Sequence, residues 1–426
     1  MIVDSLESLV RDKAINVGMP HLRLAFTPTP VGGKTREELW DYVNGYDPVS
    51  EHALMAEIVD DLTRPLNEDE MQTGIMERPK QRLLGPFTQE EMQVYFDDRF
   101  WSDNLLIMAP TEERVAEMLK ATSHKPDEKL GTFSAGSASR WGYTVEMAAI
   151  NAVMAGAKPE HFPAILAIAA SRSNPRGSST SSMTTMAVFN GPIVDELLLN
   201  DGTGALQAVY NKSGAVIGRA WALLAGNTVG GSAPGTTYLG NQGNPMGTVP
   251  AVFAENRAGL PEGWDPLHVQ KGFGADENVV STFGGCQSMS MAQVFKDENW
   301  QWHIKRTVGG LGSPNQSSKL LLIDPAVTGP LLRFGFDTKE KLIDWVKTNV
   351  TMSKFNYWLD QDVVNHRRGI ALSDREPYAS WLTLPDDAQI AYLENVNVVV
   401  VGGSGNVRWS VNECGYRTSI RVDEWR

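Results

Sequence analysis

The chain has 426 residues and a formal net charge of −13, with 38 lysines and arginines against 51 aspartates and glutamates. The acidic balance excludes a nucleic-acid-binding class, because neutralising phosphates requires a basic patch, and two cysteines are too few for a disulfide framework or a four-thiolate zinc site. A content of 42 % hydrophobic residues, without a secretory signal or a membrane-spanning apolar run, predicts a soluble cytoplasmic protein with no membrane partner.

Residues 1–100 contain too few apolar residues to predict an independent core. Thr35 followed by Glu38 is a capping-box pattern that predicts a helix ending at Gly45. A second helix is predicted after Pro48 from four apolar residues at helical spacing, Leu54, Ile58, Val59 and Leu62. We interpret 1–100 as an arm or small helical subdomain. It either wraps a partner subunit, which predicts a homo-oligomer such as a homodimer, or simply embellishes the N-terminus.

Short apolar runs followed by proline and a helical pattern predict strand–helix units. One strand is expected at 105–108, before a helix capped by Thr111, and a similar unit begins at 320–325. The two units are either an internal repeat or two ordinary strand–helix units, and the weak similarity favours the second alternative. A further strand is expected at 396–401. Alternating strands and helices predict an α/β or mixed α+β fold around a mixed sheet.

The remaining chain is divided near residue 310. We expect a glycine-rich core domain over 101–310, which carries the site, and a C-terminal α/β part over 311–426, either separate from the core domain or continuous with it. Within the core domain, Thr144 caps a helix that stops at Gly156, and a second alanine-rich helix covers 164–170. Helices this rich in alanine predict a buried, closely packed pair.

Eleven glycines lie between Gly202 and Gly247, which makes a nucleotide-binding loop the first hypothesis. No Gly-x-x-x-x-Gly-Lys-Ser/Thr loop occurs. The segment 398–405 is similar to a strand entering a dinucleotide-binding turn, but Arg408 stands where the third glycine belongs and too few residues follow for a βαβ unit. We therefore interpret 398–405 as a strand that ends in a simple turn.

The loop 226–235, which contains Gly230 and Gly231, is a better candidate for ligand binding. Glycines allow several backbone N–H groups to converge on an anion, and Arg219 on the preceding helix adds a cation. The alternative is that these glycines only permit close helix contacts.

Polar residues in apolar surroundings are the other candidates. Glu255 and Asn256 follow an apolar run, and a carboxylate buried there would have a raised pKa suited to acid–base chemistry. Glu146 either serves the same chemistry or complements the dipole of its helix from the first turn. Asn151 lies on that helix, and Asn190 either binds a ligand or only builds its turn.

His268, with Asp265 as an orienting partner, is the histidine we select for proton transfer, and a structural histidine is the alternative. No His-Glu-x-x-His pair occurs, so no metal site is predicted, and the sequence identifies no cofactor. Cys286 lies in a glycine-rich segment without a nearby base, which predicts an incidental buried thiol rather than a nucleophile.

Several of these segments together resemble a bacterial family associated with UGSC-motif (seleno)proteins, mainly over residues 100–310. The resemblance rests on the run from Ala149 to Glu160 and on Asn190-Gly191-Pro192-Ile193, Ile217-Gly218-Arg219-Ala220, Gly230-Gly231 with Pro234-Gly235, Ala254-Glu255-Asn256 and Pro266-Leu267-His268. It implies thiol or selenol redox chemistry, or cleavage of an unusual carbon–heteroatom bond. The chain departs from the family in lacking the Sec-Gly-Ser-Cys motif and in carrying Ala157 where the family often has cysteine.

The resulting hypothesis is an enzyme that cleaves a carbon–heteroatom bond of a small polar, anionic organic substrate by acid–base chemistry of the lyase or hydrolase type. The expected catalytic residues are Glu255, His268 and Glu146, and the expected substrate-binding residues are Arg219, Asn190, Asn256, Asn151, Gly230 and Gly231. The alternative is a non-catalytic partner or scaffold subunit of a thiol/selenol redox system, with a redox protein as its partner.

Overall fold

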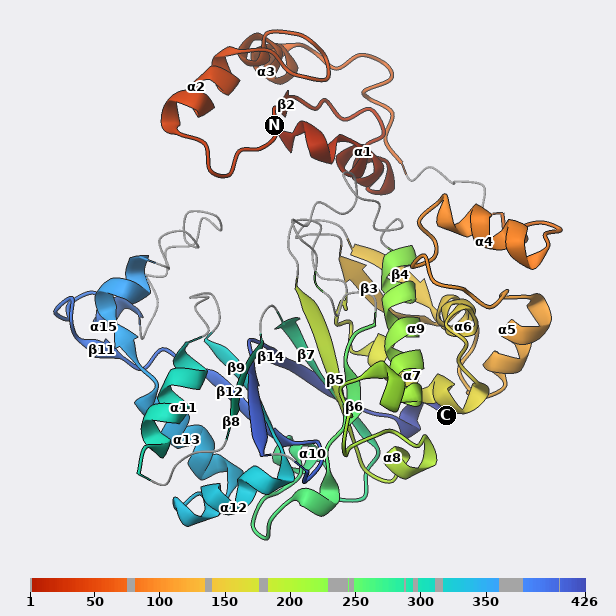
Figure 1. The fold of residues 1–426 in the computed structure, drawn as a ribbon. Helices are drawn as coiled ribbons and strands as arrows, with labels where there is room; N and C mark the ends of the chain where they lie inside the picture. The colour runs from red at the N-terminus through yellow and green to blue at the C-terminus, as the bar shows by residue number, and fades with distance from the viewer. Residues whose placement is uncertain are drawn as a thin grey trace.

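A computed structural model describes residues 2–74, 81–134, 140–175, 183–228, 244, 249–286, 289–293, 298–310, 317–359, 378–405 and 407–426. The body of the protein is built in four layers, helices on the outside and two four-stranded sheets on the inside (Figure 1). The predicted mixed α+β class is therefore confirmed. No helix in the described ranges is long and apolar enough to cross a membrane.

The first sheet has the strand order β14-β7-β5-β6. Its central strand β5 (Thr184–Asn190) runs parallel to β6 (Val252–Ala254) and antiparallel to β7 (Val279–Cys286). The outer strand β14 (Gly415–Arg421) is antiparallel to β7.

The second sheet repeats this arrangement in the order β12-β9-β13-β8. Its central strand β9 (Ser318–Ile323) runs parallel to β12 (Asn395–Val400) and antiparallel to β13 (Arg408–Asn412), which pairs antiparallel with β8 (Met289–Gln293). The registers also correspond, since Phe189 pairs with Ala254 in one sheet and Ile323 pairs with Val400 in the other.

The two repeats exchange their last strands. β8 follows β7 along the chain but joins the second sheet, and β14 follows β13 but returns to the first sheet. The central strands of the internal repeat are therefore 184–190 and 318–323. The exchanged strands β8 and β14 lie on opposite sides of the predicted boundary near residue 310, so each sheet contains strands from both sides of it.

The predicted strand at 105–108 is wrong, because this segment has no strand partner. Side chains satisfy its backbone instead: Ile107 N–H donates to Gln93 Oε1 at 2.9 Å, and Gln89 Nε2 donates to the Ile107 carbonyl at 2.9 Å. An apolar run alone does not distinguish a strand from such an extended segment.

The strands alternate between two cores, as their two-residue period requires. The inner core lies between the sheets and joins Met186, Val188, Phe253 and Phe283 to Leu320, Leu322, Val399 and Val401. The outer face of the first sheet packs on α6 (Val145–Met154), α7 (Phe162–Ala170) and α9 (Lys212–Thr228). The outer face of the second sheet packs on α11 (Trp300–Gly309), α12 (Pro325–Arg333) and α13 (Lys339–Asn349).

The alanine-rich helices are buried and closely packed, as predicted. Thr144 caps α6 by accepting a hydrogen bond from Met147 N–H. In α9, a Cβ on Gly214 would lie 2.1 Å from the Val252 carbonyl oxygen, and a Cβ on Gly218 would lie 2.5 Å from that of Pro250. These two glycines allow the helix to lie directly on the chain around β6.

A disulfide joins Cys286, the last residue of β7, to Cys414, which lies between β13 and β14, with an S–S distance of 2.02 Å. The prediction of an incidental buried thiol is therefore wrong. The two cysteines are 128 residues apart in sequence, and the exchange of strands brings them together at the inner core. Sequence spacing gave no sign of this exchange.

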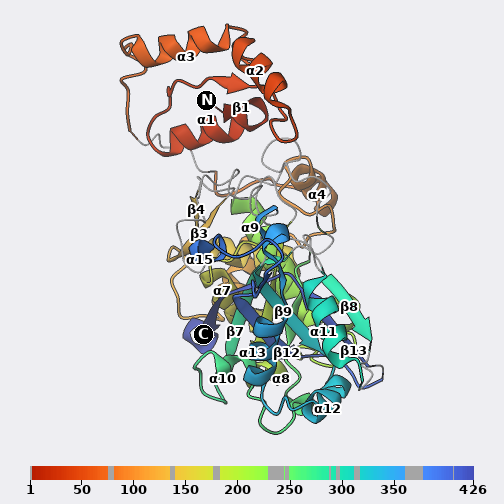
Figure 2. The ribbon, with the colours of Figure 1, turned by 90° about the vertical axis from the view of Figure 1, so that its left-hand side faces the viewer.

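The N-terminal residues form a small subdomain set apart from the body (Figure 2). It contains α1 (Glu7–Asn16), α2 (Arg36–Asn44), α3 (Leu54–Thr63) and a two-stranded parallel sheet of β1 (Ile2–Val3) and β2 (Phe26–Thr27). The predicted capping box of Thr35 and Glu38 is confirmed, and Gly45 ends α2.

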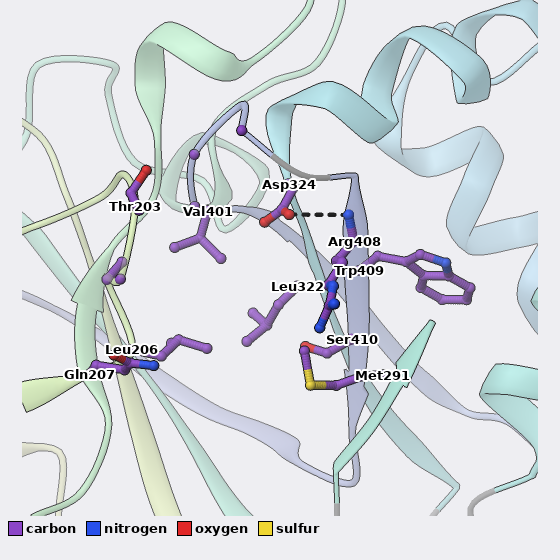
Figure 3. A pocket seen from close by; sticks show the side chains of 15 residues that line it. Thr203, Leu206, Gln207, Met291, Leu322, Asp324, Val401, Arg408, Trp409 and Ser410 are labelled. Atoms are coloured by element: carbon purple, nitrogen blue, oxygen red, sulfur yellow. Dashed lines mark hydrogen bonds between the residues drawn. The ribbon is translucent and has the colours of Figure 1, made fainter. Parts of the chain in front are cut away.

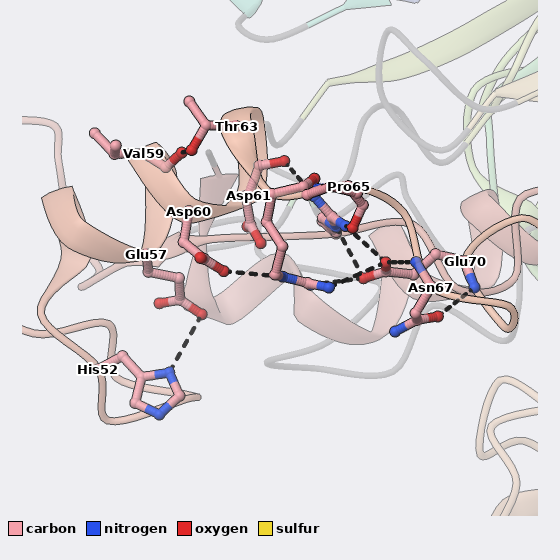
Figure 4. A network of polar contacts seen from close by, with 11 residues as sticks. His52, Glu57, Val59, Asp60, Asp61, Thr63, Pro65, Asn67 and Glu70 are labelled. Carbon is pink, nitrogen blue, oxygen red and sulfur yellow. Dashed lines mark hydrogen bonds and ion pairs between the residues drawn. The ribbon is translucent and has the colours of Figure 1, made fainter.

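A network of ion pairs and hydrogen bonds lies at the end of α3 in this subdomain (Figure 4). Arg23 pairs with Glu70 at 2.6 Å and donates to the backbone carbonyls of Asp61, Arg64 and Pro65. One guanidinium thus fastens the end of α3 to the turn that follows it.

The remaining elements connect these parts. They are α4 (Gln89–Asp97), α5 (Glu112–Leu119), β3 (Lys129–Ser134), β4 (Arg140–Thr144), α8 (Ile193–Glu196), α10 (Leu267–Gln270), β10 (Met352–Ser353), α15 (Tyr378–Trp381) and β11 (Gln389–Ile390).

Candidate functional site

Glu255 lies where β6 ends, and its carboxylate is completely buried. Oε2 accepts hydrogen bonds from Asn190 Nδ2 at 2.8 Å and Leu267 N–H at 2.6 Å. Oε1 accepts from Lys339 Nζ at 2.6 Å and Val400 N–H at 3.3 Å. Four donors occupy the acceptor positions of this carboxylate. Glu255 therefore links the two repeats, and the geometry does not support the catalytic role predicted for it.

His268 lies close to this cluster and is 2 % exposed. Its Nε2 is 3.2 Å from the Ala275 carbonyl, so this carbonyl orients the ring in place of the predicted partner Asp265. Burial lowers the pKa of His268, and the imidazole is neutral near pH 7. Such a ring has no exposed face for a substrate, which favours the structural alternative for this histidine.

Arg219 does not face a ligand loop. Its guanidinium forms a two-pronged ion pair with Asp103, with both N···O distances at 2.8 Å, and it also donates to the Leu105 and Leu106 carbonyls. Arg219 therefore holds 103–106 against α9 through its Nε and Nη2 donors. Gly230 and Gly231, the predicted anion-binding glycines, lie outside the described residues.

The other predicted residues are scattered. Glu146 pairs with the exposed Arg82 at 2.8 Å, and Asn151 donates to the Met147 carbonyl while accepting from Asn227. Asn256 accepts from Gly259 N–H and donates to the Gly402 carbonyl. Glu255, Asn190 and His268 thus converge in the interior, whereas Arg219, Glu146 and Asn151 do not join them. The predicted single cleft is not formed by these residues.

A cavity of about 390 Å³ opens instead where the parallel strands of the second repeat end (Figure 3). Its walls are the loop 203–207, the turn that follows β12, and the inward faces of β8, β9 and β13. The carboxyl ends of parallel strands are the usual place for ligands in open α/β sheets. The volume lies at the lower end of the range of small-molecule sites.

Asp324 follows the last residue of β9 and lines this cavity. Its Oδ2 accepts a hydrogen bond from Arg408 N–H at 3.1 Å. Partial burial raises the pKa of the Asp324 carboxyl above its ordinary value, and the hydrogen bond and charge of Arg408 oppose this shift. A carboxyl group with a raised pKa that borders a cavity is suited to proton transfer.

Two glycines of the turn allow the walls to approach each other. A Cβ on Gly402 would lie 2.3 Å from Asp324 Oδ1, and the φ angle of Gly402 is +104°, a conformation that favours glycine. A Cβ on Gly403 would lie 2.0 Å from Thr203 Oγ1. The glycine-rich turn therefore positions the carboxylate of Asp324 and the hydroxyl of Thr203.

Arg408 and Ser410 add polar groups from β13. The Arg408 side chain is exposed and extends along the wall toward Ser410 (Figure 3). Within the described part of the chain, no carboxylate pairs with this guanidinium and no group hydrogen-bonds to the Ser410 hydroxyl. Both groups are available to a molecule in the cavity.

Sequence reasoning missed Asp324, Arg408, Thr203 and Ser410. One signal was present: an aspartate after one predicted strand and a glycine-rich turn after another. Only the parallel pairing of β9 with β12 shows that the two lie at the same sheet edge. Among the described residues, no group of three or more histidines, cysteines or carboxylates is arranged to hold a metal ion.

Comparison of the chain with protein-family models, with curated proteins and with solved structures finds no match.

Proposed function

We propose that the protein is an enzyme that cleaves a carbon–heteroatom bond in a small polar, anionic organic substrate by acid–base chemistry of the lyase or hydrolase type. The observation that supports this proposal is a cavity at the ends of parallel strands, lined by a partly desolvated carboxyl group, Asp324, and by Arg408, whose guanidinium forms no ion pair with a described residue. Asp324 thus takes the role that the sequence analysis gave to Glu255 and His268.

Each polar group has a distinct task in this proposal. Asp324 moves a proton to or from the reacting atoms, and Arg408 holds the negative charge of the substrate. Gly402 has no Cβ, and a Cβ at this position would collide with the Asp324 carboxylate. The glycine therefore allows Asp324 to keep its position. The largely apolar walls, which include Leu206, Leu322 and Val401, raise the strength of these electrostatic contacts by excluding water.

The test is a turnover screen with small hydroxy acids, amino acids and their amides as substrates, with products followed by mass spectrometry. We expect conversion by the wild-type protein and a loss of at least about 100-fold in kcat/KM for Asp324→Asn, in line with the contribution of a general acid–base group. Glu117→Gln, which alters an exposed carboxylate outside the cavity, is the matched control and should retain turnover. Equal turnover by wild type and Asp324→Asn would overturn the assignment.

We also propose that the protein is a homo-oligomer that associates through its N-terminal quarter. Among the residues that the structure describes, 31 large apolar residues are exposed, and 19 of them lie between Val17 and Met108. On α3, Met55, Val59 and Leu62 form an exposed stripe, with Leu62 81 % exposed. Apolar surface concentrated in this way indicates an interface.

Solution mass measured by light scattering tests the association. Leu62→Asp should lower the mass toward that of one chain, because it places a charge in the proposed interface. Leu198→Asp is the matched control, since Leu198 is 83 % exposed but lies outside the N-terminal quarter. A single-chain mass for the wild-type protein would contradict the proposal.

The alternative of a redox partner or scaffold receives less support. Cys286 and Cys414 are 1 % and 0 % exposed and are bonded to each other. A thiol-exchange partner would need access to one of these sulfurs.

A further inference from the structure

Two opposite charges border the cavity without neutralising each other. The Asp324 carboxylate is held by the backbone N–H of Arg408, whereas the Arg408 guanidinium lies further along the wall, near Ser410 (Figure 3). The two side chains form no ion pair with each other or with any other described residue. The cavity therefore offers one negative and one positive group to the same occupant.

The space between these charges is lined by apolar side chains. Leu206 projects from the loop 203–207, and Leu322 and Met291 project from β9 and β8. A ligand that fits this surface carries an apolar group along with its charges. Its size is limited by the cavity volume of about 390 Å³.

The inward face of β13 adds a neutral polar group. Ser410 is 7 % exposed and presents its hydroxyl to the cavity. The Ser410 hydroxyl therefore gives a polar occupant of the cavity a neutral hydrogen-bonding group.

We propose that the cavity binds an α-amino acid with an apolar side chain, or a close derivative that keeps both charges. The ammonium group contacts the Asp324 carboxylate, the carboxylate contacts the Arg408 guanidinium and the Ser410 hydroxyl, and the side chain packs on Leu206, Met291 and Leu322. This inference deepens the proposed function, on whose cavity it rests, by giving the anionic substrate a second, positive charge.

The charges explain why simpler ligands fit less well. A monocarboxylic acid can pair with the Arg408 guanidinium but leaves the Asp324 carboxylate without a cationic partner. A simple amine would leave the Arg408 guanidinium without a partner. Only a ligand with both groups pairs both side chains, and pairing charged groups in a partly desolvated site is worth more than pairing them in water.

Calorimetric titration of the full-length protein with three probes of matched shape tests the inference. The probes are L-leucine, 4-methylpentanoate, which lacks the ammonium group, and 3-methylbutylamine, which lacks the carboxylate. We expect L-leucine to bind at least about tenfold more tightly than either of the other two, because each loses one charge-assisted contact. Equal affinity for L-leucine and 4-methylpentanoate would overturn the inference.

Two variants assign the contacts. Asp324→Asn should weaken L-leucine at least tenfold while leaving 4-methylpentanoate unchanged or tighter, and Arg408→Gln should weaken L-leucine while leaving 3-methylbutylamine unchanged. Glu117→Gln, which alters an exposed carboxylate outside the cavity, should bind all three probes as the wild-type protein does. The wild-type probe series stands even if a variant fails to fold.

The outcomes separate this inference from the proposed function. Tight L-leucine binding without conversion of any amino acid would support the ligand class and count against the enzyme. Turnover of a substrate without an ammonium group, with no binding of L-leucine, would support the enzyme and overturn the ligand class.

Discussion

Lys339 Nζ lies 2.6 Å from Glu255 Oε1, and both side chains are completely buried. Glu255 directly follows β6 of the first repeat, and Lys339 begins α13 of the second. The carboxylate also binds Asn190 of the first repeat and the Val400 backbone of the second. This ion pair is therefore a buried polar link between the two repeats, at the residue where the sequence predicted catalysis.

Replacing Lys339 by methionine should destabilise the fold strongly. The substitution leaves Glu255 charged and buried without its cation, which typically costs about 3–5 kcal/mol of unfolding free energy. Urea unfolding measures the loss. Lys341→Met is the matched control on the same helix: Lys341 pairs with Asp337 at 2.7 Å, but both side chains are more than half exposed, and such pairs contribute about 1 kcal/mol or less. Equal effects of the two variants would contradict the linking role.

Gly402→Ala should damage the cavity without unfolding the protein. The added Cβ would lie 2.3 Å from Asp324 Oδ1, at a backbone φ of +104°, so the carboxylate or the turn must shift. We expect a loss of ligand affinity or turnover of at least about tenfold, as misplaced catalytic groups cause. Gly405→Ala is the control in the same turn, since nothing lies within 4 Å of its added Cβ. A Gly402→Ala protein with full function would show that Asp324 need not hold this position.

The pH dependence of activity should follow Asp324. Burial raises the pKa of this carboxyl above its ordinary value of 3.8, so its charged form accumulates only at a higher pH. If the charged form is required, binding or turnover rises with pH across a range that begins above 3.8, and Asp324→Asn lacks this rise.

The same shift has a consequence for stability, with a defined sign. Because the folded state binds the Asp324 proton more tightly than the unfolded chain, the free energy of unfolding should fall as pH rises from 3.8 through the raised pKa. Asp324→Asn should weaken this dependence. Burial also raises the pKa of Asp201. Asp201 should therefore preserve part of the pH dependence of stability in this variant. An unchanged stability profile in Asp324→Asn would contradict the shift.

Removal of the disulfide should lower the free energy of unfolding, because the bond joins the two places where the chain passes from one sheet to the other. Cys286–Cys414 closes a long segment of chain, with a sequence separation of 128 residues, and disulfides of this kind contribute about 2–5 kcal/mol. We expect the double variant Cys286→Ser/Cys414→Ser to unfold at lower urea concentration. Thiol titration of the denatured wild-type protein without reductant should find no free cysteine. Disulfides are rare in the reducing cytosol. Two free thiols in protein isolated from cells would therefore contradict the disulfide and agree with the predicted cytoplasmic location.

Local features of the fold could be predicted from sequence, and contacts between distant segments could not. The capping box at Thr35 and the alanine-rich helix begun by Thr144 depend on neighbours a few residues away. By contrast, Glu255 meets Lys339 across 84 residues, and no local pattern encodes that contact. The polar setting of Glu255 was recognised, but a buried link and a catalytic base have the same local sequence.

The candidate site was missed for a related reason. Its residues come from a loop of the first repeat, from three strands of the second sheet and from the turn that follows β12. Strand exchange and parallel pairing bring them together, and both depend on topology. The division of the chain at residues 100 and 310, the resemblance to the UGSC-associated family and the redox alternative stay predictions.

A crystal structure with the tightest-binding compound from a screen of small metabolites would show where the protein binds its ligand. We expect the compound to occupy the cavity at the end of β9, with polar contacts to Asp324 and Arg408. A compound bound at another place, with this cavity empty, would contradict the claim that Asp324 and Arg408 form the functional site.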